Sequence, residues 1–368
     1  MDNLNKKIYD SEFDAFSDAF WSGFKTKASV RRIPVHGHFE LTPKCNFDCK
    51  MCYVHLQESQ MIQEEIKLSK WKYIIDEAIK EGMVFASLSG GECLTVPFFD
   101  ELYLYLKNKG ILVFVLTNGF LLDEKIELFK NHPPAHIQVS VYGWDDESYQ
   151  KVTGRKAYSK VINGILNAKN AGLSVSVAVT PSRYMTSVYK IVKKFYDLKI
   201  GVSVNKWLMP PYDSTGRCLD EINLSPSEKV VIEEELLKAT DSMIENTCSL
   251  NLPECGSKNS EKHYGLTCSA GRTDFSINWK GEMSPCVSLP CITGNPLKES
   301  FNEAWKNTVK FADDFELPIE CFGCKYKKIC KPCPAYHLLS DVQGHCNKDI
   351  CIETKLLVER GLKILPTN

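Results

Sequence analysis

The chain contains the stretch LTPKCNFDCKMCY, Leu41 to Tyr53, directly after a strand-like run. Its C-x3-C-x2-C spacing places three thiolates on one short loop, at Cys45, Cys49 and Cys52, where they can bind three irons of a four-iron cluster. Because no fourth cysteine lies nearby in the sequence, one iron of such a cluster would remain open to another ligand. The loop therefore indicates a metal centre with a free coordination position.

The composition is that of a globular protein that is long enough, at 368 residues, for two domains. The formal net charge of -1 gives no electrostatic reason to expect nucleic acid or an anionic membrane as the main partner. No apolar run reaches membrane-spanning length, and the N-terminal MDNLNKKIYDSEF is too polar for a secretory signal. We therefore expect a cytoplasmic location.

The 16 cysteines point to metal binding or redox chemistry, because an enzyme of this size in the cytoplasm seldom contains structural disulfides. Apart from the first loop, they are concentrated near the C-terminus, at Cys268, Cys286, Cys291, Cys321, Cys324, Cys330, Cys333, Cys346 and Cys351. This density predicts a second domain that metal holds together. A solitary thiol such as Cys93 is expected to be buried as a small apolar residue.

Short β-rich runs alternate with amphipathic helical patterns from His36 onward. The predicted strands are Gly37–Leu41, Val84–Ser89, Leu112–Leu116, Ile137–Val141, Val175–Val179 and Val202–Asn205. The predicted helices between them are Ser69–Lys80, Phe98–Lys109, Leu122–Lys130, Tyr158–Asn170 and Ser187–Leu198. This alternation predicts an α/β fold with a parallel sheet and right-handed crossovers, either a partial barrel or an open doubly wound sheet.

The chain is predicted to divide into four parts: 1–35, 36–206, 207–263 and 264–368. The first contains a helix over Tyr9–Phe24, whose aromatic stripe favours packing on the core over docking of a peptide. The third is a bridge with a turn-rich loop and an acidic helix over Ser225–Asn246. The last is the small cysteine-rich domain.

In either α/β architecture, functional residues gather where the parallel strands end. The segments at these positions are the cysteine loop, Gly90-Gly91-Glu92, Thr117-Asn118-Gly119, Ser140 and Thr180-Pro181. Taken singly, the Gly-Gly-Glu and Thr-Asn-Gly tripeptides are ordinary turns. Their shared placement predicts that they form one site.

These motifs, in this order, resemble the radical S-adenosylmethionine (SAM) superfamily over roughly nine-tenths of the chain. The resemblance implies a partial (β/α)6 TIM-like barrel and a SAM pocket beside the first cysteine loop. It implies that Tyr53 lies near the adenine and that Ser89 to Glu92, with Gly90 and Gly91, hold the methionine amino group. It also assigns to the SAM pocket Thr117, Asn118, Ser140 and Arg155, the last as a candidate for the methionine carboxylate.

The C-terminal part resembles the SPASM extension, which binds auxiliary iron–sulfur clusters. The family pattern implies an outer cluster held by Cys321, Cys324, Cys330 and Cys351. It implies an inner cluster held by Cys268, Cys286 and Cys333, with a fourth position that is open or filled by Cys248, Cys255 or Cys291. Only Lys331 and Pro332 separate Cys330 from Cys333, where the family commonly has three residues. The implied cofactors are three 4Fe-4S clusters and SAM.

The resemblance implies that a reduced cluster cleaves SAM to a 5'-deoxyadenosyl radical, and that a ribosomally synthesised peptide is modified oxidatively. The implied partners are this peptide and a reductant such as flavodoxin or ferredoxin. Many such maturases begin with a small leader-peptide-binding domain, whereas only about 35 residues precede the first strand here. A separate leader-binding protein is therefore a further expected partner.

Several alternatives remain at this point. A sulfatase-maturase-like activity requires an aspartate where Val287 stands, and a radical dehydrogenase acting on a small molecule is another possibility. From a different class comes an electron-transfer or zinc-stabilised interaction protein, since CxxC pairs and the nearby His55 also suit zinc. That last alternative predicts no cleavage of SAM.

Overall fold

The computed structural model describes residues 15–54, 65–185, 187–209, 219–240, 265–266, 268–289, 291–316, 318–321, 323–330, 333–339 and 347–365. Its centre is an eight-stranded sheet in the order β6-β5-β4-β3-β2-β1-β7-β8. Neighbouring strands from β6 to β7 are parallel, and β8 is antiparallel to β7. The strands are β1 (His36–Glu40), β2 (Phe85–Ser89), β3 (Leu112–Thr117), β4 (His136–Val141), β5 (Val175–Val179), β6 (Gly201–Val204), β7 (Asp274–Ile277) and β8 (Met283–Ser284).

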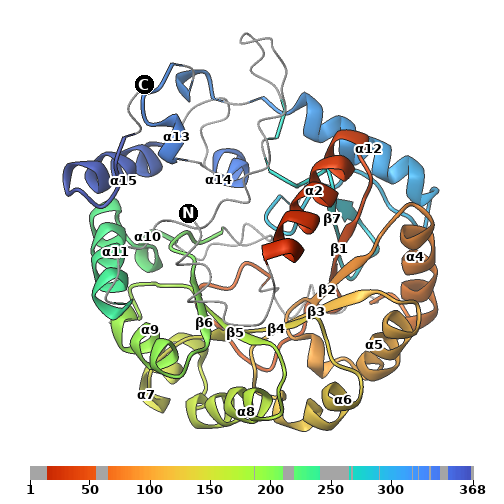
Figure 1. The fold of residues 1–368 in the computed structure, drawn as a ribbon, viewed down its shortest axis with the longest axis horizontal. Coiled ribbons are helices and arrows are strands. Elements are labelled where there is room, and N and C mark those ends of the chain that lie inside the picture. The colour runs from red at the N-terminus through yellow and green to blue at the C-terminus, as the bar shows by residue number, and fades with distance from the viewer. Residues whose placement is uncertain are drawn as a thin grey trace.

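Helices surround the curved sheet as a ring (Figure 1). Those that follow the barrel strands are α4 (Leu68–Lys80), α5 (Phe99–Asn108), α6 (Ile126–Asn131), α7 (Asp146–Thr153), α8 (Tyr158–Asn170) and α9 (Val188–Asp197). In α4, Trp71, Ile74, Ile75 and Ala78 are buried at helical spacing, so one face of the helix covers the sheet. The predicted α/β partial barrel is confirmed.

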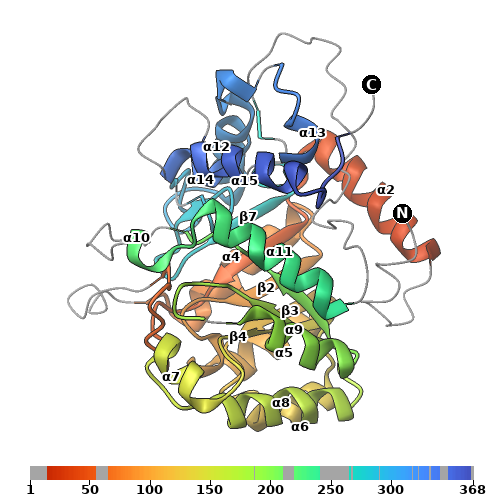
Figure 2. The ribbon, with the colours of Figure 1, turned by 90° about the vertical axis from the view of Figure 1, so that its left-hand side faces the viewer.

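The later helices lie at the opposite side of the molecule from α6 and α8 (Figures 1 and 2). They are α12 (Phe301–Asp314), α13 (Lys327–Cys330), α14 (Pro334–Leu339) and α15 (Lys348–Glu359). Two helices lie in the predicted bridge, α10 (Leu219–Ile222) and α11 (Pro226–Thr240), and short 3-10 turns occur at Cys93–Thr95, Asp123–Lys125 and Ile319–Cys321. Within the described ranges, no helix is long and apolar enough to cross a membrane.

Strand β7 was not predicted as part of the barrel. It pairs in parallel with β1, with Asp274 opposite His36, and thereby joins the cysteine-rich region to the same sheet. Packing explains the position, because the Phe275 ring lies edge-on to Phe39 of β1 and to Phe301 of α12. The proposed division into four domains stays a prediction, but two of its parts share this sheet.

The N-terminal helix ends later than the sequence suggested. Helix α2 (Ala15–Arg31) continues seven residues beyond the predicted end at Phe24, and residues 1–14 lie outside the described part. Arg32 then adopts a left-handed conformation with φ 55°, and Pro34 follows within two residues. The helix therefore ends at a left-handed residue before a proline, which the aromatic stripe alone could not indicate.

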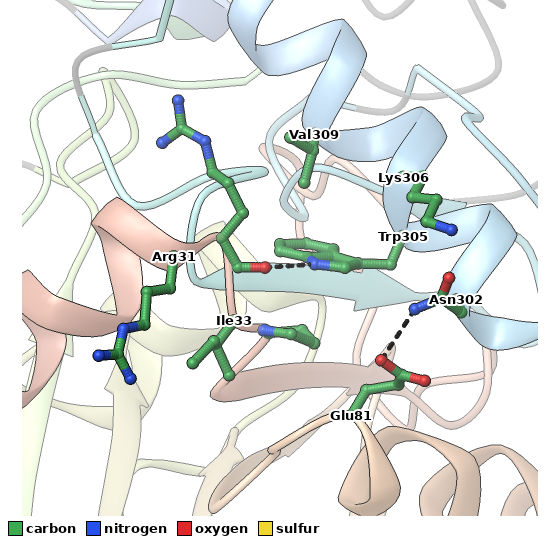
Figure 3. Close-up of a pocket in the computed structure, with 9 residues that line it drawn as sticks. Arg31, Ile33, Glu81, Asn302, Trp305, Lys306 and Val309 are labelled. Carbon is green, nitrogen blue, oxygen red and sulfur yellow. Dashed lines mark hydrogen bonds between the residues drawn. The ribbon is translucent and has the colours of Figure 1, made fainter.

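A joint beneath the barrel connects α2, α4 and α12 (Figure 3). The Trp305 indole N–H donates to the Arg32 carbonyl at 2.7 Å, and the Arg32 guanidinium pairs with Asp313. The Asn302 amide donates to Glu81 at the end of α4, at 2.9 Å. These contacts attach the C-terminal region to the end of the barrel at which the parallel strands begin, opposite the loops that follow the strands.

The inner face of β1 carries ionisable side chains, His36, His38 and Glu40, in alternation with Gly37 and Phe39. Burial, with a smaller contribution from the neighbouring His38, lowers the pKa of His36 to about 3. Glu40 is 2% exposed, and the Tyr53 hydroxyl lies 3.5 Å from its Oε1. Burial raises the pKa of Glu40 to about 8, so the carboxyl group is protonated at neutral pH.

We predict that Glu40→Gln changes how stability depends on pH. Between 4.5, the ordinary pKa, and the folded value of about 8, the folded state retains a proton that the unfolded state has lost. Over this window the free energy of unfolding of the wild type falls by about 1.4 kcal/mol per pH unit because of Glu40. Urea unfolding at about pH 5.5 and about pH 7.5 measures this fall in the free energy of unfolding. The fall due to Glu40 should be absent in Glu40→Gln and present in the exposed control Glu127→Gln. Equal pH slopes in wild type and Glu40→Gln would contradict a protonated Glu40.

Candidate functional site

The Gly90-Gly91 turn after β2 lies against the backbone that leads into the cysteine loop. Gly91 N–H donates to the Thr42 carbonyl at 2.7 Å, and Glu92 N–H donates to the Lys44 carbonyl at 2.9 Å. A Cβ added at Gly91 would lie 2.3 Å from the Lys44 carbonyl oxygen, and Gly90 has φ +130°. Only glycine permits this approach and this conformation, so the turn fixes where the cysteine loop begins.

The Glu92 carboxylate connects the ends of β2 and β3. One oxygen accepts from Leu94 N–H at 3.0 Å and from the Thr117 hydroxyl at 2.8 Å; the other accepts from Asn118 N–H at 2.6 Å. The side chain is 1% exposed, and burial raises its pKa although these three donors lower it. The predicted pocket residues Glu92, Thr117 and Asn118 are thus in direct contact.

The three loop cysteines lie close enough to influence one another. Burial, with smaller contributions from the negative charges of Glu92 and Cys52, raises the pKa of Cys45 to about 11. Burial also raises the pKa of Cys49, and Cys52 and Cys45 raise it further. Three thiolates this close together repel one another and need a cation among them, which the irons of an iron–sulfur cluster supply. The donor set therefore fits the cluster that the sequence implied.

Asn118 and Arg155 both reach the cysteine loop. The Asn118 amide donates to Asn46 Oδ1 at 2.6 Å and lies 3.6 Å from Cys45 Sγ. An Arg155 N–H donates to the Asn46 carbonyl at 3.1 Å, while its guanidinium stacks over Phe120 at 4.7 Å. Among the described residues, the buried Asn46 Nδ2 has no hydrogen-bond partner. This orphaned donor beside the thiols is consistent with a group that binds there.

Ser140 reaches the cysteines through a residue that the sequence analysis missed. The Ser140 hydroxyl hydrogen-bonds to Tyr142, which in turn hydrogen-bonds to Cys49. Burial raises the pKa of Tyr142, and the charge of Cys49 raises it further. Tyr142 directly follows β4, two residues after Ser140, and this spacing, which places both side chains on one face of an extended chain, was the available signal in the sequence.

Tyr53 lies between the first cysteine loop and the C-terminal cysteines. Burial raises the pKa of its phenol, and the nearby Glu40, Cys52 and Cys286 raise it further. Its neighbour Val54 packs on Trp279, which follows β7. Glu40, the hydrogen-bond partner of Tyr53, is a second site residue that sequence reasoning missed, because its position inside the strand looked like ordinary alternation.

The C-terminal cysteines form two groups in the structure. Burial, with smaller contributions from Cys333 and Cys268, raises the pKa of Cys286 to about 12. Burial also raises the pKa of Cys330, together with the nearby Cys351, Cys321 and Cys324. These groups have the same members as the inner and outer sets implied by the sequence; the role of each cysteine as a ligand remains a prediction.

The fourth ligand of the inner set is still open. Cys291 is half-buried, and burial alone raises its pKa, with no contribution from another cysteine. The other two candidates, Cys248 and Cys255, lie outside the described residues, as do Cys346, Cys218 and His55. Cys93 is fully buried, as expected for an apolar thiol, and lies 3.4 Å from the Leu116 carbonyl.

Comparison with known families and proteins agrees with this geometry. Residues 39–183 match the radical SAM superfamily, and residues 268–334 match the SPASM iron-sulfur cluster-binding domain. The chain is 28% identical to the AdoMet-dependent heme synthase of Methanosarcina barkeri (strain Fusaro / DSM 804), over 81% of this chain and 90% of that protein. It is 26% identical to the antilisterial bacteriocin subtilosin biosynthesis protein AlbA of Bacillus subtilis (strain 168), over 75% of this chain and 60% of AlbA.

A solved structure shares the fold over most of its length. Streptococcus suis SuiB bound to precursor peptide SuiA superposes with a TM-score of 0.62 and 16% identity, over 93% of this chain and 82% of SuiB. The first family match contains the three cysteines of the first loop, and the second contains the three cysteines of the inner set. This chain belongs to the radical SAM superfamily and carries a C-terminal SPASM domain.

Proposed function

We propose that this radical SAM enzyme modifies a ribosomally synthesised peptide oxidatively, with SAM bound at the first cysteine loop and two auxiliary clusters in the SPASM region. The observation that carries the proposal is the position of Tyr53, which lies close to Cys52 of the first loop and to Cys286 of the inner set and hydrogen-bonds to the buried Glu40. A path of buried groups thus connects the place where SAM would react to the place where an electron would leave.

The residues of the chain would hold the cofactors as follows. Cys45, Cys49 and Cys52 would bind the first cluster, and Tyr53, Gly90, Gly91, Glu92, Thr117, Asn118, Ser140 and Arg155 would form the pocket for SAM. When bound, the cluster and SAM together supply a reductive cleavage that yields a carbon radical able to take hydrogen from unactivated carbon. The chain itself orients the substrate and excludes water.

Because its pKa is about 8, a minority of Glu40 carboxyl groups is ionised at neutral pH, and this ionised form would accept the proton that an oxidised substrate releases. Its carboxyl group is buried, and its pKa of about 8 makes proton uptake and release both accessible near neutral pH. The Tyr53 hydroxyl hydrogen-bonds to Glu40 and links it to the first loop. An oxidative reaction needs such a group, because removal of an electron from a substrate radical usually accompanies loss of a proton.

Support for a peptide substrate comes from AlbA, a relative that takes part in bacteriocin biosynthesis, and from the shared fold of SuiB, which binds precursor peptide SuiA. A small-molecule substrate is the second candidate. It is favoured by the heme synthase, because this chain spans 90% of that protein and 60% of AlbA. Partners that we propose are a flavodoxin or ferredoxin as reductant and a separate leader-binding protein.

We predict that the triple change Cys45→Ala, Cys49→Ala and Cys52→Ala abolishes formation of 5'-deoxyadenosine from SAM under reducing conditions. The three thiolates are the only ligands that the loop offers to the first cluster, so the variant cannot load it. Liquid chromatography with mass detection measures the product. The control is the variant with Ala at Cys321, Cys324, Cys330 and Cys351, because it also lacks several cysteines but retains those of the first loop. Product formation by the triple variant would contradict the assignment of the SAM site.

We predict about twelve irons per chain after anaerobic reconstitution if all three clusters are 4Fe-4S. Removal of the outer set, by Ala at Cys321, Cys324, Cys330 and Cys351, should lower this to about eight without preventing cleavage of SAM. Iron analysis and Mössbauer spectroscopy measure both values. A wild-type content of about four irons would refute the two auxiliary clusters.

The substrate class can be tested with a short peptide encoded beside the gene. We expect a loss of hydrogen mass from this peptide when it is incubated with the enzyme, SAM and a reductant, measured by high-resolution mass spectrometry. We expect Glu40→Gln to slow the modification more than it slows SAM cleavage, since Glu40 would act on the substrate proton. An unchanged peptide, with turnover of a tetrapyrrole instead, would favour the small-molecule alternative.

A further inference from the structure

Three side chains of types that bind metals, two imidazoles and a carboxylate, lie together inside the barrel. His36 and His38 of β1 lie on the strand face opposite Phe39, which packs on Trp71 of α4. Asp274 of β7 is directly opposite His36 in the parallel register. The two imidazole rings stack with their centroids 4.2 Å apart. Pairing of β1 with β7 therefore places two imidazoles and one carboxylate together.

The distances suit a bound ion better than a set of hydrogen bonds. His36 Nδ1 lies 3.9 Å and His38 Nε2 lies 3.7 Å from Asp274 Oδ2, both beyond ordinary hydrogen-bond length. One ligand atom from each of the three residues lies within 4.8 Å of the others. Ligands of a tetrahedral zinc ion, each about 2.0–2.1 Å from the metal, are about 3.3 Å apart, so each histidine would have to move about half an ångström closer to Asp274 to complete the site.

Hydroxyl groups orient His36 and Asp274 from behind. His36 Nε2 lies 2.8 Å from Ser87 Oγ, and in the tautomer in which Nε2 donates to this hydroxyl, Nδ1 presents its lone pair to Asp274. Asp274 Oδ2 accepts from the Ser269 hydroxyl at 2.9 Å, and Oδ1 accepts from Thr273 at 2.8 Å. Outer partners of this kind hold the ligands of metal sites in position.

In the tautomer in which Nε2 donates to Ser87, the lone pair of His36 Nδ1 faces the Asp274 carboxylate, and a cation between them would stabilise this arrangement. All three side chains are largely buried, with exposures of 14% for His36, 25% for His38 and 15% for Asp274. The greater exposure of His38 gives an ion access to the group. Lys25 of α2 adds a positive charge near His36, which opposes a cation and limits the affinity.

We propose that His36, His38 and Asp274 bind one divalent transition-metal ion of the zinc type. Two imidazoles and a carboxylate are borderline ligands that zinc accepts, and three protein ligands leave one position for water. The ion would join β1, which leads into the SAM-binding loop, to β7, with which the SPASM region enters the sheet. The proposal is independent of the substrate proposed above.

The test uses the full chain with its iron–sulfur clusters loaded, so that the cysteines are occupied. After addition of about one equivalent of Zn²⁺ and desalting, we expect about one zinc per chain in the wild type. We expect less than about a tenth of a zinc in His38→Ala and in Asp274→Asn, with iron content unchanged. Removal of the outer partner in Ser87→Ala should weaken binding about tenfold. Plasma mass spectrometry measures both metals.

A second measurement does not depend on metal retention. Zn²⁺ should raise the thermal unfolding midpoint of the wild type and leave that of Asp274→Asn unchanged, because only a ligand of the folded state stabilises it. The exposed His132→Ala variant is the control and should bind zinc like the wild type. The proposal would be overturned if the wild type, His38→Ala and Asp274→Asn all bound the same amount of zinc, whether that is no zinc or one zinc per chain.

Discussion

The contact between Gly91 and the backbone of Lys44 is the constraint on which the site depends. Because the two chain segments touch without a side chain between them, the end of β2 fixes the start of the cysteine loop. Glu92, the next residue, then places Asn118, whose amide returns to the same loop. This one close contact between two backbones thus positions the ends of β1, β2 and β3 around the thiols before any cofactor binds.

The second half of the chain completes the site through β7. This strand lies beside β1, so Cys286 comes near Tyr53 although the two are far apart in the sequence. The Trp305 joint below the barrel and the Trp279 contact above it hold the region at both ends. A rigid connection of this kind suits electron transfer, in which the distances between centres must stay constant.

Much of this arrangement could be predicted from the sequence. The ends of parallel strands meet at one edge, so the proximity of Cys45, Glu92 and Asn118 followed from the alternation of strands and helices. The position of β7 could not be predicted, because a four-residue strand whose partner is distant in sequence has no local signal. Tyr142 and Glu40 were missed for a related reason: their importance depends on which side chains face them across the barrel.

The pairing of β1 with β7 also has a consequence for the order of folding. β1 begins at His36 and its partner at Asp274, so one edge of β1 stays without this neighbour until most of the chain has left the ribosome. The first cysteine loop directly follows that edge. The nascent barrel therefore exposes its cysteine loop and an unpaired strand edge at the same time, until β7 is synthesised. During this period a cluster can reach the loop, and the exposed edge can pair with other chains and aggregate.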